Sequence, residues 1–505
     1  MKERAARVAD RMFSRGWLGA LAAVHDSTMF RAALGLSLGV IVGFQAPGLR
    51  IVHLAALALA AGCVAVLWRI NWAILALVFL SPFHYAIKEL SSSMLVDVWR
   101  ELLLLLILGG WLARVLVRRQ PFYPNEFISL VLVAYLLWGV VEIFNSVNLL
   151  VGLAGFRYLF GFVPLYFVAR STITGEREVR RFINAILVGG VIVAVIAVVQ
   201  FVVVSVLGVV ERGTSIDFVR KYAPMSYAVS GIPWHRSNSI LVSPNELGLF
   251  LAACLVLTYS YCLSMGRRPR RSWLLVTSML CMGAGLLVSM SRSAILGLAA
   301  GMLAVGIVKR RGAPAVLIGL VLAATVALIV APFYVVALFA PVYTFSDPYF
   351  ASTLKSALES KPTWESPFVG RGYSVTPSAM QKLRIEDDSV GVLGGVDMYA
   401  LQLVTQIGFV GFTLFCLGWL VFLARAFRVA RYTSGSTFSR DTAAGVFGAL
   451  VTMMVASSHV DAWGYVSLAA TYYLLGAIVT STPDPVAPSG PAGASVVAAT
   501  VGSEP

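Results

Sequence analysis

Charged residues are scarce in this sequence. They make up 12% of its 505 residues, whereas 59% are hydrophobic and the mean hydropathy is +0.84. No soluble domain has this balance, so the composition predicts an all-α, polytopic integral membrane protein. The net charge of +15 follows the loops between apolar spans, and we therefore interpret it as membrane sidedness rather than as a sign of nucleic-acid binding.

Cysteine and histidine are also few, with five of each. The cysteines all fall inside apolar spans, which argues against a disulfide framework, and they are Cys63, Cys254, Cys262, Cys281 and Cys416. No Cys/His spacing is typical of a metal site, so we expect neither a metal nor another cofactor. The inverted repeats and mid-span charges that are typical of transporters are not found either.

Long apolar runs dominate the rest of the chain. About 20 apolar residues are needed to cross the hydrocarbon core of a bilayer, and by that measure we expect about fourteen transmembrane helices. They are predicted at 32–46, 50–68, 71–87, 98–117, 126–144, 149–169, 182–208, 246–263, 273–290, 294–308, 315–340, 398–424, 443–457 and 465–480. Lys- and Arg-rich loops alternate with poor ones, which places both termini in the cytoplasm by the positive-inside rule.

The polar segments divide the chain into regions. A basic cytoplasmic N-terminus, residues 1–31, precedes a membrane domain at 32–480. The Pro/Gly/Ala-rich tail at 481–505 cannot bury a core, so we expect it to be disordered and cytoplasmic. Two loops are long enough to hold a substrate, at 210–243 and 341–396, and both are expected on the outer face. The second leads into one long apolar helix.

Three arginines near span ends are candidates for function because charge is costly there. Arg157 lies close to the outer end of the sixth span, Arg236 precedes the eighth, and Arg292 occupies the turn of a tight helical hairpin. A guanidinium forks onto phosphate oxygens, so three of them at one depth would suit a pyrophosphate. The alternative for each is an ordinary headgroup anchor.

Five segments follow one another in a specific order. They are GFRYLFGFVPLYF (155–167), SPNELGLFLAACLVL (243–257), VSMSRSAILGLAAGML (288–303), SPFVGRGYS (366–374) and DMYALQLVTQIGFVG (397–411). Their order, with a long outer loop between the fourth and fifth, resembles the bacterial O-antigen ligase and polymerase superfamily of membrane glycan-assembly proteins. The resemblance covers about residues 150–425.

One position departs from the ligases of that superfamily. They typically carry a histidine and an asparagine at the head of the last segment, followed by a Gly-x-x-Gly. Here Gly408 and Gly411 keep the spacing, but Asp397 and Met398 replace the two polar residues. The resemblance therefore favours the polymerases, in which the histidine is not a fixed feature. A carboxylate at Asp397 can accept or orient the proton of an acceptor hydroxyl.

The resemblance implies a metal-independent glycosyltransferase in the bacterial cytoplasmic (inner) membrane. It would join O-antigen or exopolysaccharide repeat units, carried on a polyprenyl diphosphate, to a glycan or lipid-glycan acceptor at the outer face. Arg236 and Arg292 would stabilise the leaving diphosphate, and Asp397 would act on the acceptor. The further candidates for substrate binding are Arg157, Arg371, Asn245 and Gln402.

Two alternatives remain open at this point. A ligase of the same superfamily would move finished glycan to a lipid or a protein. A lipid-linked glycan flippase or transporter would also suit about fourteen spans. A chain-length regulator and a separate flippase are expected partners of a polymerase, and membrane lipid surrounds the protein in every case.

Overall fold

The computed structural model describes most of the helical part of the chain. The described residues are 69–89, 98–118, 126–146, 149–206, 226–229, 232–241, 243–264, 269–310, 368–370, 372–373, 399–433, 436–457 and 465–482. The chain divides into two units, Met1–Ala73 and Ile74–Pro505. Of the first unit only residues 69–73 are described, and every contact discussed below lies within the second.

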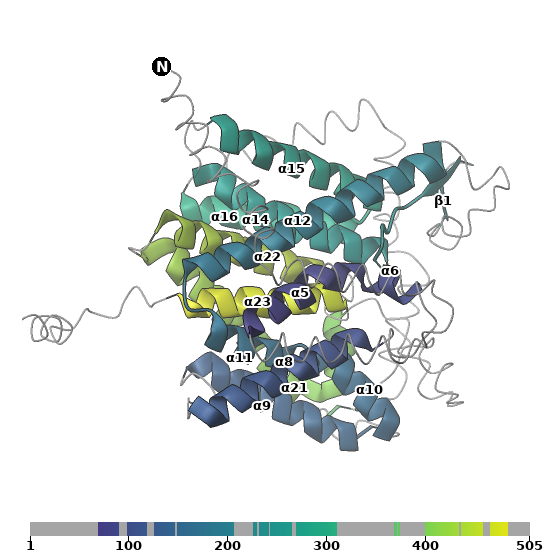
Figure 1. Ribbon diagram of the computed structural model, residues 1–505. Helices are drawn as coiled ribbons and strands as arrows, with labels where there is room; N and C mark the ends of the chain where they lie inside the picture. Colours follow the sequence, from purple (N-terminus) through teal and green to yellow (C-terminus); the bar gives the residue numbers. More distant parts are fainter. Residues whose placement is uncertain are drawn as a thin grey trace, which may run out of the picture. The chain divides into compact units, whose positions relative to one another are not determined.

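Helices make up nearly all of the described residues. In chain order the elements are α5 (Ile70–Leu80), η1 (Ser81–Phe83), α6 (His84–Glu89), α8 (Trp99–Arg118), α9 (Phe127–Phe144), α10 (Leu149–Phe160), α11 (Val163–Thr172), α12 (Glu176–Phe201), the π-helical turn η2 (Val202–Val206), β1 (Ser226–Val229), β2 (Ile232–His235), α14 (Pro244–Ser264), α15 (Pro269–Ser289), α16 (Arg292–Lys309), α21 (Tyr399–Tyr432), α22 (Thr437–Ser457) and α23 (Val466–Ser481). The long helices of the second unit run roughly alongside one another (Figure 1).

Several helices are able to span a membrane. Six of those described are long and apolar enough, or seven if the bent pair α10 and α11 forms one span. Eleven of the predicted spans coincide with described helices, including the short ones that become α16 and α22. The spans predicted at 32–46, 50–68 and 315–340 lie outside the described residues, as do residues 1–31, the tail from 483 onward and most of both long loops.

Helix α14 forms the centre of a group with α12, α15, α16 and α22. It is apolar on all sides, which is typical of a helix surrounded by others, and its residues from Glu246 to Ser260 are buried. Small residues let α16 and α22 approach each other closely. A Cβ at Gly301 would lie 2.1 Å from Thr452 Oγ1, and one at Gly448 would lie 2.7 Å from the carbonyl oxygen of Gly301.

Helix α9 presents an apolar face to the surroundings. The most exposed of its large side chains are Phe127, Leu130, Leu137 and Phe144, each at least 60% exposed, and they are spaced three or seven residues apart. Residues at this spacing share one face of a helix. Such a face is costly in water and is satisfied by lipid chains, which supports a membrane protein.

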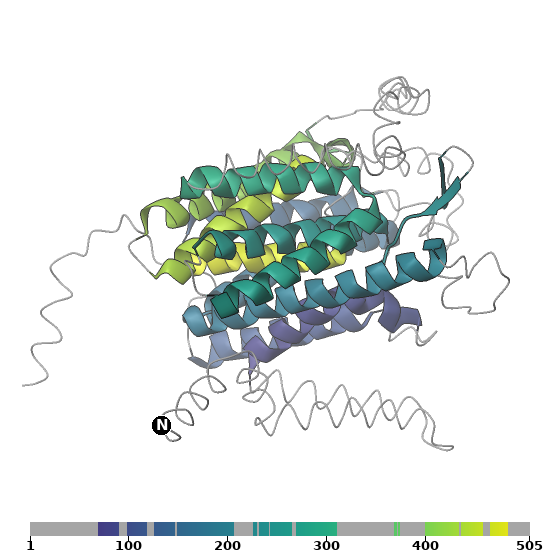
Figure 2. The same ribbon diagram turned by 90° about the horizontal axis from the view of Figure 1, so that it is seen from above.

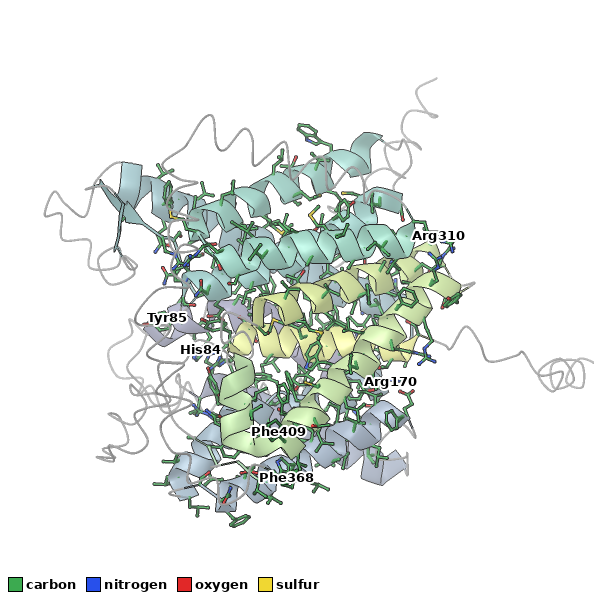
Figure 3. All side chains as sticks on the ribbon, turned by 180° about the vertical axis from the view of Figure 1, so that it is seen from behind. His84, Tyr85, Arg170, Arg310, Phe368 and Phe409 are labelled. Atoms are coloured by element: carbon green, nitrogen blue, oxygen red, sulfur yellow. The ribbon has the colours of Figure 1, made fainter. Side chains whose placement is uncertain are left out.

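Polar side chains from several helices lie at one end of the second unit. We call it the site end, and it includes the start of α8 and the end of α9. There Trp99 Nε1, at the start of α8, donates a hydrogen bond to His84 Nδ1 at 3.0 Å. Asn145 Nδ2, at the end of α9, donates to the carbonyl oxygen of Gly370 at 3.1 Å. Figure 3 labels His84 and Tyr85 at this end.

The opposite end carries closely paired charges. Lys309 Nζ donates to Asp441 Oδ1 at 2.7 Å, and Arg170 Nη2 donates to Glu126 Oε1 at 2.6 Å. Figure 3 places Arg170 and Arg310 at this end, away from His84. Helix α9 therefore runs from one end to the other, because Glu126 precedes it here and Asn145 follows it at the site end.

Three local features differ from the sequence-based expectation. Helix α21 is not one continuous helix, because Gly408 interrupts it with φ 65° and ψ −178°. The predicted sixth span is a pair, α10 and α11, bent by 41°. The first long loop contains a short antiparallel hairpin, β1–β2, with Tyr227 opposite Trp234; Figure 2 shows it beyond the end of α12.

Candidate functional site

Arg236 is held between the start of α14 and the turn that joins α15 to α16. Its Nη2 donates a hydrogen bond to Asn245 Oδ1 at 2.9 Å, and its Nε donates to the carbonyl oxygen of Ser289 at 3.1 Å. Ser291 Oγ donates to the same Asn245 oxygen at 3.1 Å. The rigid fork of donors on a guanidinium allows both contacts at once, so Arg236 and Asn245 join α14 to the helical hairpin.

The segment that carries Arg236 rests on a buried polar network. Gln200 Oε1, near the end of α12, accepts hydrogen bonds from Ser237 Oγ at 2.5 Å and from the backbone N–H of Ser239 at 2.8 Å. Gln200 Nε2 donates to Asn238 Oδ1 at 3.2 Å. Ser239 has a φ of 55°, a left-handed conformation that costs energy outside glycine. A satisfied network of this kind is rigid, so the backbone at Arg236 is fixed before any ligand binds.

Arg292 begins α16, directly after the turn that Arg236 binds. Its side chain is exposed, whereas Ser291 before it is buried. Helix α14 approaches this point closely, since a Cβ at Gly248 would lie 2.7 Å from Ser291 Cβ. The backbone N–H groups and the partial positive charge of a helix start favour an anion, and Arg292 adds a full charge there.

A second charged group lies at the start of α8. The side chain of Arg100 is 9% exposed, and its Nη2 lies 3.8 Å from Glu101 Oε1. The same Glu101 oxygen lies 3.7 Å from Nε of Arg157 on α10. The carboxylate of Glu246 also attracts the positive charge of Arg100, whereas the positive charge of Arg157 repels it. Glu246 directly follows Asn245 at the start of α14, so this charge is carried by the helix start that also binds Arg236.

Glu246 itself is fixed at the start of α14. Its carboxylate Oε1 accepts a hydrogen bond from Ser467 Oγ on α23. Its backbone N–H donates to Ser243 Oγ at 3.1 Å, which is the usual contact of a residue that caps a helix start. Ser243 Oγ donates in turn to Tyr465 OH at 2.9 Å. The start of α14 is therefore tied to the start of α23 as well as to the α15–α16 turn.

The break in α21 is filled by residues 368–370 of the long loop. The backbone N–H of Val410 donates to the carbonyl oxygen of Phe368 at 3.3 Å. A Cβ at Gly408 would lie 2.2 Å from that oxygen, and one at Gly370, whose φ is 62°, would lie 2.4 Å from the nitrogen of Gly408. Only glycine fits both positions. Phe368 and Phe409 lie close together at this contact (Figure 3).

The other side of this loop segment packs on α9 and α10. Asn145 Nδ2 donates to the carbonyl oxygen of Gly370, and Tyr373 OH donates to the carbonyl oxygen of Gly139 at 2.6 Å. A Cβ at Gly155 would lie 2.2 Å from Tyr373 Cβ, so the tyrosine packs directly against α10. Residues 368–373 thus connect the α9–α10 pair to the broken part of α21.

The structure brings some of the predicted site residues together. Arg236 and Asn245 are hydrogen-bonded, and Arg292 stands on the turn that both contact. Arg157 pairs with Glu101 on α8 instead of joining the other two arginines directly. The expectation of three arginines at one point therefore becomes two adjoining groups at one end.

The remaining predicted residues are not described. Asp397 and Arg371 lie outside the described residues, although Gly370 and Gly372 on either side of Arg371 are placed. Gln402 belongs to α21, but its side chain also lies outside them. Arg100, Glu101 and Glu246 were missed by the sequence analysis. The signal for them was present, because each is a charge in the first turn of a predicted span.

Contacts join the five sequence segments in two sets, one of two segments and one of three. The segment at 243–257 contacts the one at 288–303 through Asn245 and Ser291. The segment at 366–374 contacts the last segment through Phe368 and Val410. The same segment contacts the first through Tyr373 and Gly155.

Comparison with known proteins yields no relative from which function could be transferred. No protein-family model matches the chain, and no curated protein matches it either. Among the described residues, no group of three or more His, Cys, Asp or Glu side chains is arranged to hold a metal ion.

Proposed function

We propose that the protein is a membrane glycosyltransferase that polymerises glycan repeat units. The donor is an oligosaccharide on a polyprenyl diphosphate, and the acceptor is a sugar hydroxyl of a second lipid-linked or growing glycan. The product is a surface polysaccharide of the O-antigen or exopolysaccharide kind. The reaction needs no metal, because a diphosphate is already a good leaving group.

One observation carries this proposal. Residues about 50 positions apart in the sequence contact one another at the site end, and two of them, Asn245 and Ser291, belong to the segments that resemble glycan-assembly enzymes. Arg236, Asn245 and Ser291 are the clearest case, with Arg292 directly after them. A rigidly held arginine beside an exposed one at a helix start suits a diphosphate headgroup, which offers several anionic oxygens.

The chemistry follows from these positions. The acceptor hydroxyl oxygen attacks the anomeric carbon of the donor sugar, and the bond from that carbon to the diphosphate oxygen breaks. The electron pair leaves with the diphosphate, where Arg236 and Arg292 stabilise the developing charge. Asp397 takes the proton of the acceptor hydroxyl. Arg157, Arg371, Asn245 and Gln402 position the two substrates.

The proposal includes the membrane arrangement. About fourteen spans with both termini in the cytoplasm of a bacterium place the site end at the outer face of the cytoplasmic membrane. The opposite end, which carries closed ion pairs and the basic residues Arg170 and Arg310, then faces the cytoplasm, in accord with the positive-inside rule. A flippase that delivers the donor and a chain-length regulator are the expected partners.

The test is the length of the product made by the purified protein in liposomes supplied with polyprenyl-diphosphate-linked repeat units. A polymerase gives a ladder of glycans that differ by one repeat unit. A ligase gives a single transfer to another lipid or a protein, and a flippase gives no new bond. Either of these two results would exclude the polymerase.

A further inference from the structure

Arg100 is a buried charge whose hydrogen bonds are incomplete. Its side chain is 9% exposed, yet its Nε–H has no hydrogen-bond partner among the described residues. Oε2 of Glu101 beside it is also buried and without a partner there. Leaving a buried charged group unsatisfied costs more than leaving a neutral one, so such an arrangement calls for an explanation.

The neighbouring charged side chains do not complete the hydrogen bonds of Arg100. Glu101 Oε1 lies 3.8 Å from Arg100 Nη2 and 3.7 Å from Arg157 Nε, and both distances are too long for a hydrogen bond. The carboxylate stands between two guanidinium groups and bonds to neither. Arg157 is 59% exposed in its side chain, so the group is open on that side.

The opposite end of the molecule provides the contrast. There the pair Arg170–Glu126 closes at 2.6 Å and the pair Lys309–Asp441 at 2.7 Å, both with hydrogen bonds. Pairs that only stabilise the fold are expected to close in this way, because the hydrogen bonds offset the desolvation of the charges. The open geometry at Arg100 is therefore not a general property of the ion pairs in this chain.

We propose that Arg100 is a further binding residue for the anionic headgroup of the lipid-linked donor. This inference rests on the proposed function. A phosphate oxygen between Arg100 and Arg157 accepts the hydrogen bonds that Glu101 leaves unmade, and Glu101 is the internal counterion that the ligand displaces. The position suits this role because Glu246, which attracts the Arg100 charge, adjoins Asn245 and through it Arg236. The site then extends from the α15–α16 turn to the start of α8.

The experiment measures binding without turnover. Farnesyl diphosphate is titrated against the purified protein in detergent, and its dissociation constant is compared with those of inorganic pyrophosphate and farnesol. We expect farnesyl diphosphate to bind most tightly. Arg100→Lys keeps the charge but loses the Nε–H and the fork, so it should weaken binding roughly tenfold or more. Arg170→Lys, at the opposite end, is the matched control and should bind as the wild type does.

A second variant covers the case in which Arg100→Lys does not fold. Glu101→Gln keeps the shape and removes the competing negative charge, so farnesyl diphosphate should bind severalfold more tightly. Unchanged affinity in either the Arg100 or the Glu101 variant would overturn the assignment. If inorganic pyrophosphate bound as tightly as farnesyl diphosphate, the bound anion would not be the headgroup of a lipid-linked donor.

The glycosyltransferase activity and the role of Arg100 are two proposals, and each can be excluded without the other. A ladder of products with unchanged binding in Arg100→Lys would leave the glycosyltransferase intact and remove Arg100 from the site. If binding depends on Arg100 but the protein forms no polymer, the anion site is supported and the polymerase is excluded.

Discussion

Arg236 illustrates how much one side chain contributes to the site end. Two of its hydrogen bonds run to different elements, Asn245 on α14 and the backbone of Ser289 at the end of α15. A lysine could reach one of them but not both, because its donors share a single nitrogen. The arginine is therefore fixed by geometry as well as by charge, and its charge is presented in one direction.

Replacing Arg236 or Arg292 by lysine should lower turnover roughly a hundredfold or more in each case. A donor that meets developing charge in the transition state is worth about 3 kcal/mol, and lysine keeps the charge without the fork. The measurement is the initial rate of polymer formation per amount of purified protein. Arg431→Lys is the control, since Arg431 Nη1 donates to the carbonyl oxygen of Val308 at the opposite end. Near-normal turnover in both site variants would make these arginines structural.

Asp397→Asn should reduce polymer formation by roughly 10²–10⁴-fold, the usual contribution of general-base catalysis. The substitution keeps the shape of the side chain and removes its ability to take a proton. Binding of farnesyl diphosphate should persist, because the arginines are untouched. If Asp397 only capped the start of α21, asparagine would serve as well. Wild-type rates in Asp397→Asn would therefore exclude the carboxylate as the base.

At the level of elements, sequence and structure agree where apolar length decides the outcome. The described helices fall where about 20 apolar residues predict spans, including the α15–α16 hairpin with Arg292 at its turn. The break in α21 was not predictable in this way. It depends on Phe368 and Gly370 packing against Gly408, a contact across about 40 residues that no local pattern encodes. The charge of Arg100 in the first turn of a predicted span was visible in the sequence, but only packing shows that its side chain is buried.

Gly408→Ala should destabilise the protein and reduce its activity. The new methyl group would lie 2.2 Å from the carbonyl oxygen of Phe368, at a φ of 65° that alanine seldom adopts. We expect a loss of roughly 1–3 kcal/mol from the backbone strain alone. Gly418→Ala on the same helix is the matched control, since its Cβ would only touch Leu132 at 3.6 Å. Thermal unfolding of the two variants in detergent measures the difference, and equal midpoints would contradict the contact.

At the scale of the whole second unit, the described residues form two chemically distinct ends. The loosely paired charge of Arg100 and a buried polar network lie at the site end, whereas closed ion pairs such as Lys309–Asp441 lie at the other. Between them the exposed side chains of α9 are apolar along one face. This division is what a membrane enzyme needs if it meets its substrate at one surface only.

The sidedness can be measured by labelling with an impermeant maleimide on intact spheroplasts. Ser215→Cys and Ser356→Cys, in a background without the five natural cysteines, should react if both long loops face outward as we propose. Ser434→Cys, in the loop between α21 and α22, is the control and should react only after lysis. The reverse pattern would invert the topology and move the site end to the cytoplasm.

We propose that glycan chains grow by transfer from a polyprenyl diphosphate at the site end. The most direct measurement follows released polyprenyl diphosphate and new glycosidic bonds in the same liposome reaction with purified protein. One molecule of polyprenyl diphosphate should be released for each bond formed, and both rates should fall together in Arg236→Lys. Bonds formed without release of the lipid diphosphate, or lipid-linked donor that moves across the membrane with no bond formed, would contradict it.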